Sequence, residues 1–129
     1  MKQRKRSTVV KELDKVFSLY IRQRNANLDG FVECVTCGRS NHWKKMQCGH
    51  FMSRRKYATR WNEINCQVQC YGCNVMQQGQ QYKFGVWIDQ EYGGEMADDL
   101  VRLSNDTVKF TTPELEIMIE GYKEMLSEL

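Results

Sequence analysis

Apolar residues recur at helical spacing near the start of the chain. Between residues 8 and 25 they fall three or four positions apart, which is the period of an amphipathic α-helix. This apolar face comprises Val9, Val10, Leu13, Val16, Phe17, Tyr20 and Ile21. The turn-forming sequence Asn27-Leu28-Asp29-Gly30 follows directly. We therefore predict an N-terminal helix that ends before this turn.

The central part of the chain has shorter apolar runs that are typical of strands. "FVECVTCG", from Phe31, predicts a short strand that runs into a Cys-x-x-Cys turn, and "CQVQC", from Cys66, alternates as a second strand would. Between them we predict a loop over residues 38–48 and a strand over 48–53. The segment "RRKYATRWNEIN" shows no clean period and predicts an irregular loop. "CYGCNVMQQG" predicts a second Cys-x-x-Cys turn that enters a helix, with Gly79 near its end.

The C-terminal third returns to helical periodicity. One predicted helical face carries Phe84, Trp87, Ile88 and Tyr92, and Gly93-Gly94 would end that helix. A second short helix carries Met96, Leu100 and Leu103, and "TVKF" predicts a brief strand after it.

The last predicted helix has a start signal. Thr112 is the predicted N-cap, Pro113 takes the first helical position and Glu114 lies in the first turn. Its predicted buried face comprises Leu115, Met118, Ile119, Tyr122, Met125 and Leu126.

Length and composition narrow the class of protein. A chain of 129 residues suits one domain with a modest core, and no apolar run is long enough for a membrane span. The basic N-terminus is not followed by the apolar run of a secretory signal, so we expect a cytoplasmic protein that does not associate with membranes. Thiols stay reduced there, and the six cysteines therefore favour metal binding or chemistry over disulfides.

The two halves of the chain carry opposite charge. Residues 1–60 have 15 Lys and Arg against 4 Asp and Glu, whereas residues 61–129 have 4 against 12. The first half therefore carries +11 and the second −8, which sum to the net charge of +3. This asymmetry favours a basic face that binds a polyanion such as nucleic acid, although solvated surface charge is the simpler alternative.

Two Cys-x-x-Cys pairs predict a metal site. Cys34 and Cys37 are separated from Cys70 and Cys73 by 32 intervening residues. Four thiolates suit a tetrahedral structural Zn²⁺, and one pair after a hairpin with the other at a helix start is the treble-clef arrangement. Disulfides and redox thiols are the alternatives. Cys48 and Cys66 are left over; they are small buried hydrophobes unless Cys48, or His50 beside it, enters a metal shell.

The chain has two histidines, and His50 lies between the two cysteine pairs. Asn65 precedes the second pair, and Asn74 directly follows Cys73. This order of His, Asn and Asn resembles the HNH nuclease motif in its HNN variant, which is built on a ββα-metal fold inside a treble clef. The alternatives are a packed or zinc-binding histidine, a turn-forming Asn65 and a helix N-cap at Asn74.

A longer set of motifs resembles the NinG/Rap family of bacteriophage recombination proteins. They cover residues 10–105 and include "LDKVFSLYIRQRNANLDGFVECVTCG", "CGHF", "RWNEIN", "QCYGCN" and "EYGGE". The resemblance implies an endonuclease that cuts branched DNA, such as Holliday junctions and D-loops, during phage recombination in the host cytoplasm. Where the family often has Gly-Asn after the second cysteine pair, this chain has Gly79-Gln80.

The resemblance also implies roles for the site residues. His50 would be the general base, Asn65 would orient it, and Asn74 would bind a catalytic Mg²⁺ or Mn²⁺, with His50 a further candidate ligand. A neutral imidazole can accept a proton from water near pH 7, and a divalent ion can stabilise the leaving oxygen. Many HNH enzymes have an acidic metal ligand directly before the histidine, but Gly49 stands there. Glu63 or another distant carboxylate, water and DNA phosphate would have to complete the shell.

Basic residues flank the proposed site in sequence. Our candidate phosphate contacts are Lys44, Lys45, Arg54, Arg55, Lys56 and Arg60. Tyr57 and Trp61 are candidates to stack on an unpaired base, and Trp61 is equally well placed for the core. The alternative for the cations is a solvated loop. No segment resembles a base-reading helix, so selectivity for DNA structure fits better than strict sequence reading.

The fold class that follows is α+β: a small ββα-metal, HNH-like treble-clef core with structural zinc, flanked by N-terminal and C-terminal helices. We divide the single domain 1–129 into a basic arm (1–7), an N-terminal helix (8–26), the zinc-bound HNH-like core (31–79) and a helical C-terminal part (80–129). A homodimer and phage or host recombination proteins are the expected partners besides DNA. The competing functions are a non-catalytic zinc module that binds DNA or a recombinase, and an HNH nickase without junction preference.

Overall fold

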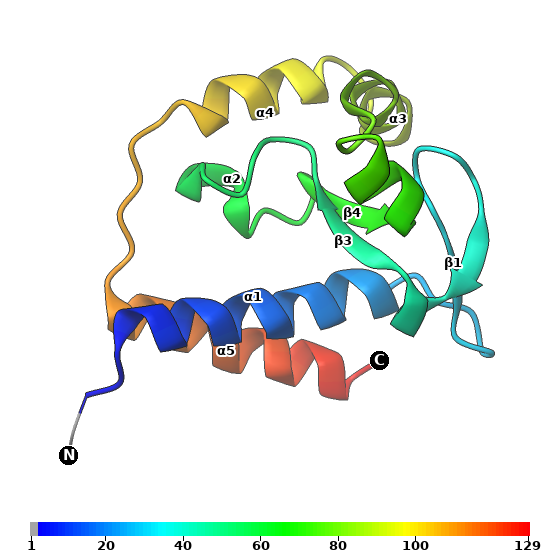
Figure 1. Cartoon of the computed structure of the whole chain (residues 1–129). Helices are drawn as coiled ribbons and strands as arrows, with labels where there is room; N and C mark the ends of the chain where they lie inside the picture. Colours follow the sequence, from blue (N-terminus) through cyan, green and yellow to red (C-terminus); the bar gives the residue numbers. More distant parts are fainter. Residues whose placement is uncertain (1–2) are drawn as a thin grey trace.

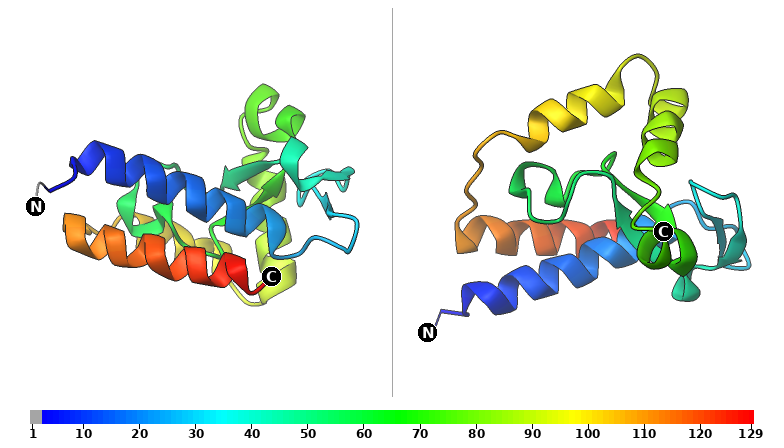
Figure 2. Two further views of the ribbon diagram at one scale, coloured as in Figure 1. Left: turned by 90° about the horizontal axis from the view of Figure 1, so that it is seen from below. Right: turned by 45° about the horizontal axis from the view of Figure 1, so that its top comes forward.

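The computed structural model describes residues 3–129 as two pairs of short strands held among five helices. Helices α1 (Arg6–Gln23) and α5 (Thr112–Ser127) lie side by side along one edge of the molecule. Helices α3 (Gln81–Tyr92) and α4 (Met96–Ser104) lie across the opposite side, with β3 and β4 between the two layers and the β1 region at one end (Figures 1 and 2). Mixed helix and small-sheet architecture is therefore confirmed.

Helix α1 begins two residues earlier than the sequence predicts, because the helical backbone starts inside the basic arm at Arg6. The arm's first two residues lie outside the described part of the chain. The predicted apolar face is confirmed, because Val9, Leu13, Val16, Phe17 and Ile21 are buried. They pack with Leu115 and Ile119 of α5 and with Trp61 and Cys66 from the middle of the chain.

Two antiparallel hairpins carry the candidate site. Strand β1 (Phe31–Glu33) pairs with β2 (Ser40–His42), and β3 (Gln47–His50) pairs with β4 (Cys66–Gln69). The predicted loop over 38–48 was therefore wrong in part: it contains β2, the 3-10 turn η1 (Trp43–Lys45) and the start of β3. The polar sequence of β2 carries no strand signal, and pairing with β1 fixes its conformation.

The strand predicted over 48–53 is also corrected, because β3 ends at His50. Phe51 N donates to the carbonyl of Asn65 at 2.8 Å, and the Asn65 side chain binds both backbone groups of Met52, so the chain bends away from the sheet. The predicted irregular loop that follows contains a four-residue helix, α2 (Tyr57–Arg60). Trp61 at its end is buried in the core.

After β4 the chain forms the predicted turn and a short helix, η2 (Gly72–Met76), which is a single π-helical turn. Gly79 has φ +88°, a left-handed conformation that favours glycine, so the predicted helix end near Gly79 is confirmed. Helices α3 and α4 follow as predicted. Phe84 and Ile88 of α3 pack with Phe51, Ala97 and Leu100 in a second apolar cluster.

Two predictions about the C-terminal segment were wrong. Residues 107–110, "TVKF", form no strand, because this segment crosses alone from α4 to α5 (Figure 1), and the Arg6 side chain donates to the Phe110 carbonyl at 2.6 Å. The N-cap of α5 is Thr111 rather than Thr112. Thr111 and Glu114 form a capping box in which each side chain binds the other's backbone N–H.

Within residues 3–129, no helix is both long enough and apolar enough to span a membrane.

Candidate metal centre and the pocket at His50

The four predicted zinc ligands converge. Cys34 and Cys37 follow β1, Cys70 directly follows β4, and Cys73 lies in η2. Their sulfur atoms all lie within 4.8 Å of one another. Three of the side chains are buried, and Cys37 is exposed. The chain therefore brings together two cysteine pairs that are far apart in sequence.

The geometry of this group fits a tetrahedral zinc ion. Sulfurs bound at about 2.3 Å to one tetrahedral zinc lie about 3.8 Å apart, and Cys37 Sγ lies 3.7 Å from Cys70 Sγ. All six cysteines are free thiols in this structure, and the Cys37–Cys70 distance is well above the roughly 2.05 Å of a disulfide. The group could therefore hold a structural metal such as zinc.

Their surroundings shift the pKa values of Cys34 and Cys73 in opposite directions. Burial raises the pKa of Cys34, but the Thr36 hydroxyl and backbone hydrogen bonds outweigh it and lower this pKa to about 6. Burial and the adjacent thiols raise the pKa of Cys73 to about 12. The Cys34 thiolate thus forms readily while the Cys73 thiol resists ionisation, and a bound dication would remove that resistance.

His50 is the last residue of β3, and its ring is fixed by the backbone. Nε2 lies 3.0 Å from the carbonyl oxygen of Arg60. Because a carbonyl oxygen only accepts, Nε2 carries the hydrogen and Nδ1 of the neutral ring keeps the lone pair. Burial lowers the pKa of His50, with a smaller opposite effect from the Arg60 carbonyl, so the imidazole is neutral near pH 7.

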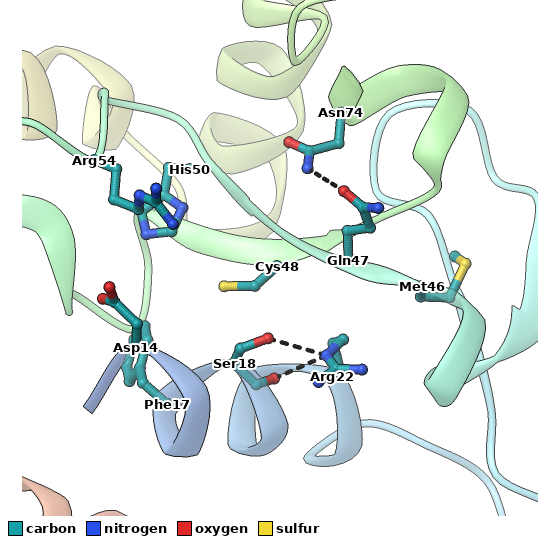
Figure 3. Close-up of a pocket in the computed structure, with 10 residues that line it drawn as sticks. All are labelled: Asp14, Phe17, Ser18, Arg22, Met46, Gln47, Cys48, His50, Arg54 and Asn74. Carbon is teal, nitrogen blue, oxygen red and sulfur yellow. Dashed lines mark hydrogen bonds between the residues drawn. The ribbon is translucent and has the colours of Figure 1, made fainter. Parts of the chain in front are cut away.

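His50 lines a pocket of about 320 Å³ between α1 and the β3–β4 hairpin (Figure 3). Asn74, Arg54, Cys48 and Asp14 also contribute to its walls. Two of the three residues of the predicted His-Asn-Asn set, His50 and Asn74, therefore face one cavity, although they are 24 residues apart in sequence.

Asn74 sits in η2 immediately after a zinc-ligand candidate. Its Nδ2 donates to Gln47 Oε1 at 2.7 Å, and Figure 3 shows its side-chain oxygen turned away from Gln47. Asn74 is therefore not a simple N-cap, because its amide group bridges η2 to β3. Its oxygen is free to accept a hydrogen bond or bind an ion.

Asn65 is fully buried and does not line the pocket. Its Oδ1 accepts from Met52 N at 2.8 Å, and its Nδ2 donates to the carbonyls of Met52 (3.2 Å) and Thr59 (3.0 Å). The Asn65 side chain thus joins the segment after His50 to the segment before Arg60, which supplies the carbonyl that holds the His50 ring. These contacts would suit the orienting role that the sequence predicts for Asn65, and that role stays a prediction.

The side chain of Gln69 occupies the space beside Gly49. A Cβ atom added to Gly49 would lie 2.0 Å from Gln69 Oε1. Gln69 is fully buried, and its Nε2 donates to the Gly79 carbonyl at 2.8 Å. A side chain before His50 would therefore require the buried Gln69 side chain to move.

The predicted phosphate contacts differ in their surroundings. Lys44, Lys45, Arg54, Arg55 and Lys56 are exposed, and Arg54 reaches the pocket wall. Arg60 instead forms an ion pair with Asp14 of α1 at 2.6 Å and donates to the Arg54 carbonyl. Its charge is thus neutralised within the molecule.

The rings of Tyr57 and Trp61 both lie against the Arg60 guanidinium group. Trp61 Nε1 donates to Asp14 at 2.9 Å, and the ring is buried, so of the two alternatives for Trp61 the core position is the observed one. Tyr57 stacks on Trp61 with ring centroids 5.6 Å apart. Asp14, Arg60 and Trp61 together fasten the segment after His50 to α1.

The oxygen ligands for a hard divalent ion are sparse. Glu63 lies away from the pocket, where it accepts a hydrogen bond from Tyr122 at 3.2 Å. Asp14, which the sequence analysis missed, is the pocket's carboxylate, but its oxygens already accept three hydrogen bonds. The signal for Asp14 in the sequence was its place among the apolar residues of α1, one helical turn before Ser18, which also lines the pocket. By themselves, these residues fit Mg²⁺ poorly.

Cys48 and Cys66, left over by the sequence analysis, lie beside His50. Their sulfurs and a ring nitrogen of His50 are within 4.8 Å of one another. Among residues 3–129, this group and the four-cysteine group are the clusters of three or more Cys, His, Asp or Glu with metal-binding geometry.

The chain was compared with known proteins. The family described as Bacteriophage Lambda NinG protein matches it over residues 1–129. A relative named Protein ninG, from Escherichia phage lambda, is 25% identical over 127 residues. That alignment covers 96% of this chain and 58% of the lambda protein, so the chain spans little more than half the length of this relative. No solved structure matches.

Proposed function

The chain belongs to the NinG family of bacteriophage proteins, and from this premise and the pocket at His50 we propose that it is a metal-dependent DNA endonuclease. It hydrolyses phosphodiester bonds in branched DNA of the Holliday junction or D-loop type. The observation that carries the proposal is the neutral His50 ring, fixed through Nε2–H to the Arg60 carbonyl in a pocket shared with Asn74 and Arg54.

In this proposal His50 is the general base. Its Nδ1 lone pair takes a proton from a water molecule in the pocket, and the water oxygen attacks phosphorus as the 3′ oxygen leaves. Because a neutral imidazole has a single lone pair, His50 acts as base rather than as ligand of the catalytic ion. Asn65 positions the ring by holding the two segments on either side of it.

Mg²⁺ or Mn²⁺, when bound, would neutralise charge on the phosphate and on the leaving oxygen. Asn74, through its side-chain oxygen, is the candidate ligand, and DNA phosphate and water supply the remaining positions. Arg54, Arg55 and Lys56, in the exposed turn after His50, and Lys44 and Lys45 in η1 are the proposed phosphate contacts.

The framework of this site supports an HNH-like core. Strands β3 and β4 with η2 form the ββα unit, and the cysteines after β1 and at the end of β4 form the zinc site of a treble clef. We propose this assignment for the core within residues 31–79.

The test is cleavage of a labelled four-way junction and of a matched linear duplex, with Mg²⁺ or Mn²⁺. Wild-type protein and His42→Ala, which changes the histidine that does not line the pocket, should cut the junction, and His50→Ala should not. His50→Ala should still bind the junction. Equal cutting of both DNAs would favour an HNH nickase without junction preference.

A second candidate function is a non-catalytic zinc module that binds DNA or a recombination protein. The poor set of oxygen ligands among residues 3–129 favours it, because neither metal-binding group contains a carboxylate. Tight junction binding with no cutting in either metal would establish this function instead.

Two strands of a junction must be cut, so we also propose a homodimer. The apolar faces of α1 and α5 are turned toward each other within one chain. A dimer interface would therefore lie elsewhere, and light scattering that shows a monomer with and without junction DNA would contradict the dimer.

A further inference from the structure

We propose that Cys48, His50 and Cys66 form a second metal site, which takes a thiophilic divalent ion such as Zn²⁺. The consequence, which rests on the proposed function, is that this ion switches the nuclease off by occupying its base. The site differs from the four-cysteine group in position and in ligands.

The β3–β4 pairing brings the three side chains together. His50 lies directly opposite Cys66, and Cys48 stands two residues before His50, so all three project from the same face of the hairpin. Their ligand atoms lie within 4.8 Å of one another. Ligands of one tetrahedral zinc lie roughly 3.6–3.8 Å apart, so small side-chain rotations would close the site.

A backbone contact already orients one of the ligands. The Arg60 carbonyl accepts from His50 Nε2 at 3.0 Å. Metal-binding histidines commonly donate their other ring N–H to such a carbonyl, which fixes the tautomer and the ring orientation. The Arg60 carbonyl therefore already holds the His50 ring as it would if the other ring nitrogen bound a metal.

The pocket provides both access and a fourth coordination position. Cys48 and His50 line it, whereas Cys66 is fully buried behind them. Three protein ligands with one open position is the arrangement of an accessible zinc site. Two sulfurs and one nitrogen, without a carboxylate, select a soft or borderline ion over Mg²⁺.

The two metal-binding groups are at opposite ends of β4. Cys66 begins this strand, and Cys70 directly follows its last residue, Gln69. Neighbouring residues of a strand are spaced about 3.3 Å apart along it, so the two groups would bind separate ions. A zinc-saturated chain should therefore hold two ions rather than one.

An ion at this site would stop the proposed chemistry at one atom. The neutral imidazole has a single nitrogen lone pair, and a metal that takes it leaves none to accept a proton from water. Zinc at Cys48, His50 and Cys66 and proton transfer by His50 therefore exclude each other.

The test uses reduced protein that has been purified with one equivalent of zinc and is then titrated anaerobically with Co²⁺. Wild type should bind one equivalent of cobalt and develop thiolate-to-cobalt charge-transfer absorption. Cys66→Ala and Cys48→Ala should lose this absorption while keeping their one zinc. His42→Ala, the control for histidine, should behave as wild type. If buried Cys66 cannot be changed without unfolding, half-buried Cys48 still gives the answer.

Two outcomes would overturn the site: no absorption in folded wild type, or absorption that persists in Cys48→Ala. A wild-type mass two hydrogens lower after reduction and repurification, with peptide mapping that joins Cys48 to Cys66, would instead identify a Cys48–Cys66 disulfide and also overturn it. These readouts need no cleavage, so they decide the site even if the chain cuts no DNA.

The inhibitory effect is measured separately, as the ratio of junction cleavage rates with and without a second equivalent of Zn²⁺ for each variant. Wild type should lose nearly all activity, and Cys66→Ala should keep its own zinc-free rate. Equal zinc sensitivity of both proteins would contradict the switch. If wild type cuts under no condition, the proposed function fails while the cobalt result stands.

Discussion

At the scale of single residues, the candidate site depends on side chains whose neighbours could not be identified from sequence. Asn65 was predicted as a residue that orients His50, and its contacts with Met52 and Thr59 show how a buried amide could do so. Asp14 was missed, because an isolated acid on α1 gives no sign that it meets Arg60 and Trp61. The absence of an acid at Gly49 was visible, but its cause, the Gln69 side chain, was not.

Asn65→Ala should destabilise the protein by roughly 1–3 kcal/mol, because it leaves the backbone N–H and carbonyl of Met52 without their Asn65 partners. Guanidinium unfolding followed by circular dichroism measures this difference. Asn105→Ala serves as the control, because it removes an exposed hydrogen bond from the side-chain amide to the Val101 carbonyl. Its expected change is below about 0.5 kcal/mol. Similar losses for both variants would contradict a special role for Asn65.

Gly49→Ala should cost about 1–3 kcal/mol, because the new methyl group would overlap Gln69 Oε1. The double variant Gly49→Ala/Gln69→Ala should show a favourable coupling energy between the two sites in thermal unfolding. Gly121→Ala in α5 meets no neighbour within 4 Å and should instead stabilise by about 0.5–1 kcal/mol. Additive effects at Gly49 and Gln69 would show that the two residues do not compete for space.

At the scale of elements, strong periodicity gave correct assignments and short segments did not. Helices α1, α3, α4 and α5 were predicted because their apolar residues repeat over two or more turns. Strand β2 and helix α2 were missed, since three or four residues carry too little pattern and tertiary contacts decide their conformation. The N-cap of α5 was misplaced by one residue, because Thr111 and Thr112 are equally good caps in sequence.

Thr111→Ala should destabilise the protein by about 0.5–2 kcal/mol, because the hydroxyl caps the N–H of Glu114. Thr112→Ala is the matched control: it changes the same residue type one position later, inside the helix, and should have a smaller effect. Chemical denaturation of both variants gives the comparison. A larger loss at Thr112 would place the N-cap where the sequence analysis put it.

At the scale of the whole molecule, the described residues form three separate apolar clusters, and two of them differ in their relation to the four cysteines. The helices α1 and α5 share an apolar core with Trp61 and Cys66. The β1–β2 hairpin and the start of η2 depend on a smaller cluster that includes Cys34, Cys70 and Cys73. A metal at the four cysteines would therefore stabilise one end of the molecule more than the other.

Removal of zinc with a chelator under reducing conditions should lower the melting temperature and expose the hairpin end first. Hydrogen exchange followed by mass spectrometry should show faster exchange in residues 31–45 and 70–76 than in α1 and α5. Cys37→Ser should reproduce this pattern without chelator, because it removes one exposed ligand and no core contact. Uniform acceleration along the chain would mean that the metal supports the whole fold equally.

The sequence alone determined the long helices, the family resemblance and the two cysteine pairs, because each is a local pattern of residue type and spacing. The tertiary structure decided which of those residues meet. It placed Asp14 and Arg54 in the pocket with His50, took Arg60 into an ion pair, and brought Cys48 and Cys66 to the same histidine. Such contacts depend on strand register and on the packing of α1 against the β3–β4 hairpin, which no local pattern encodes.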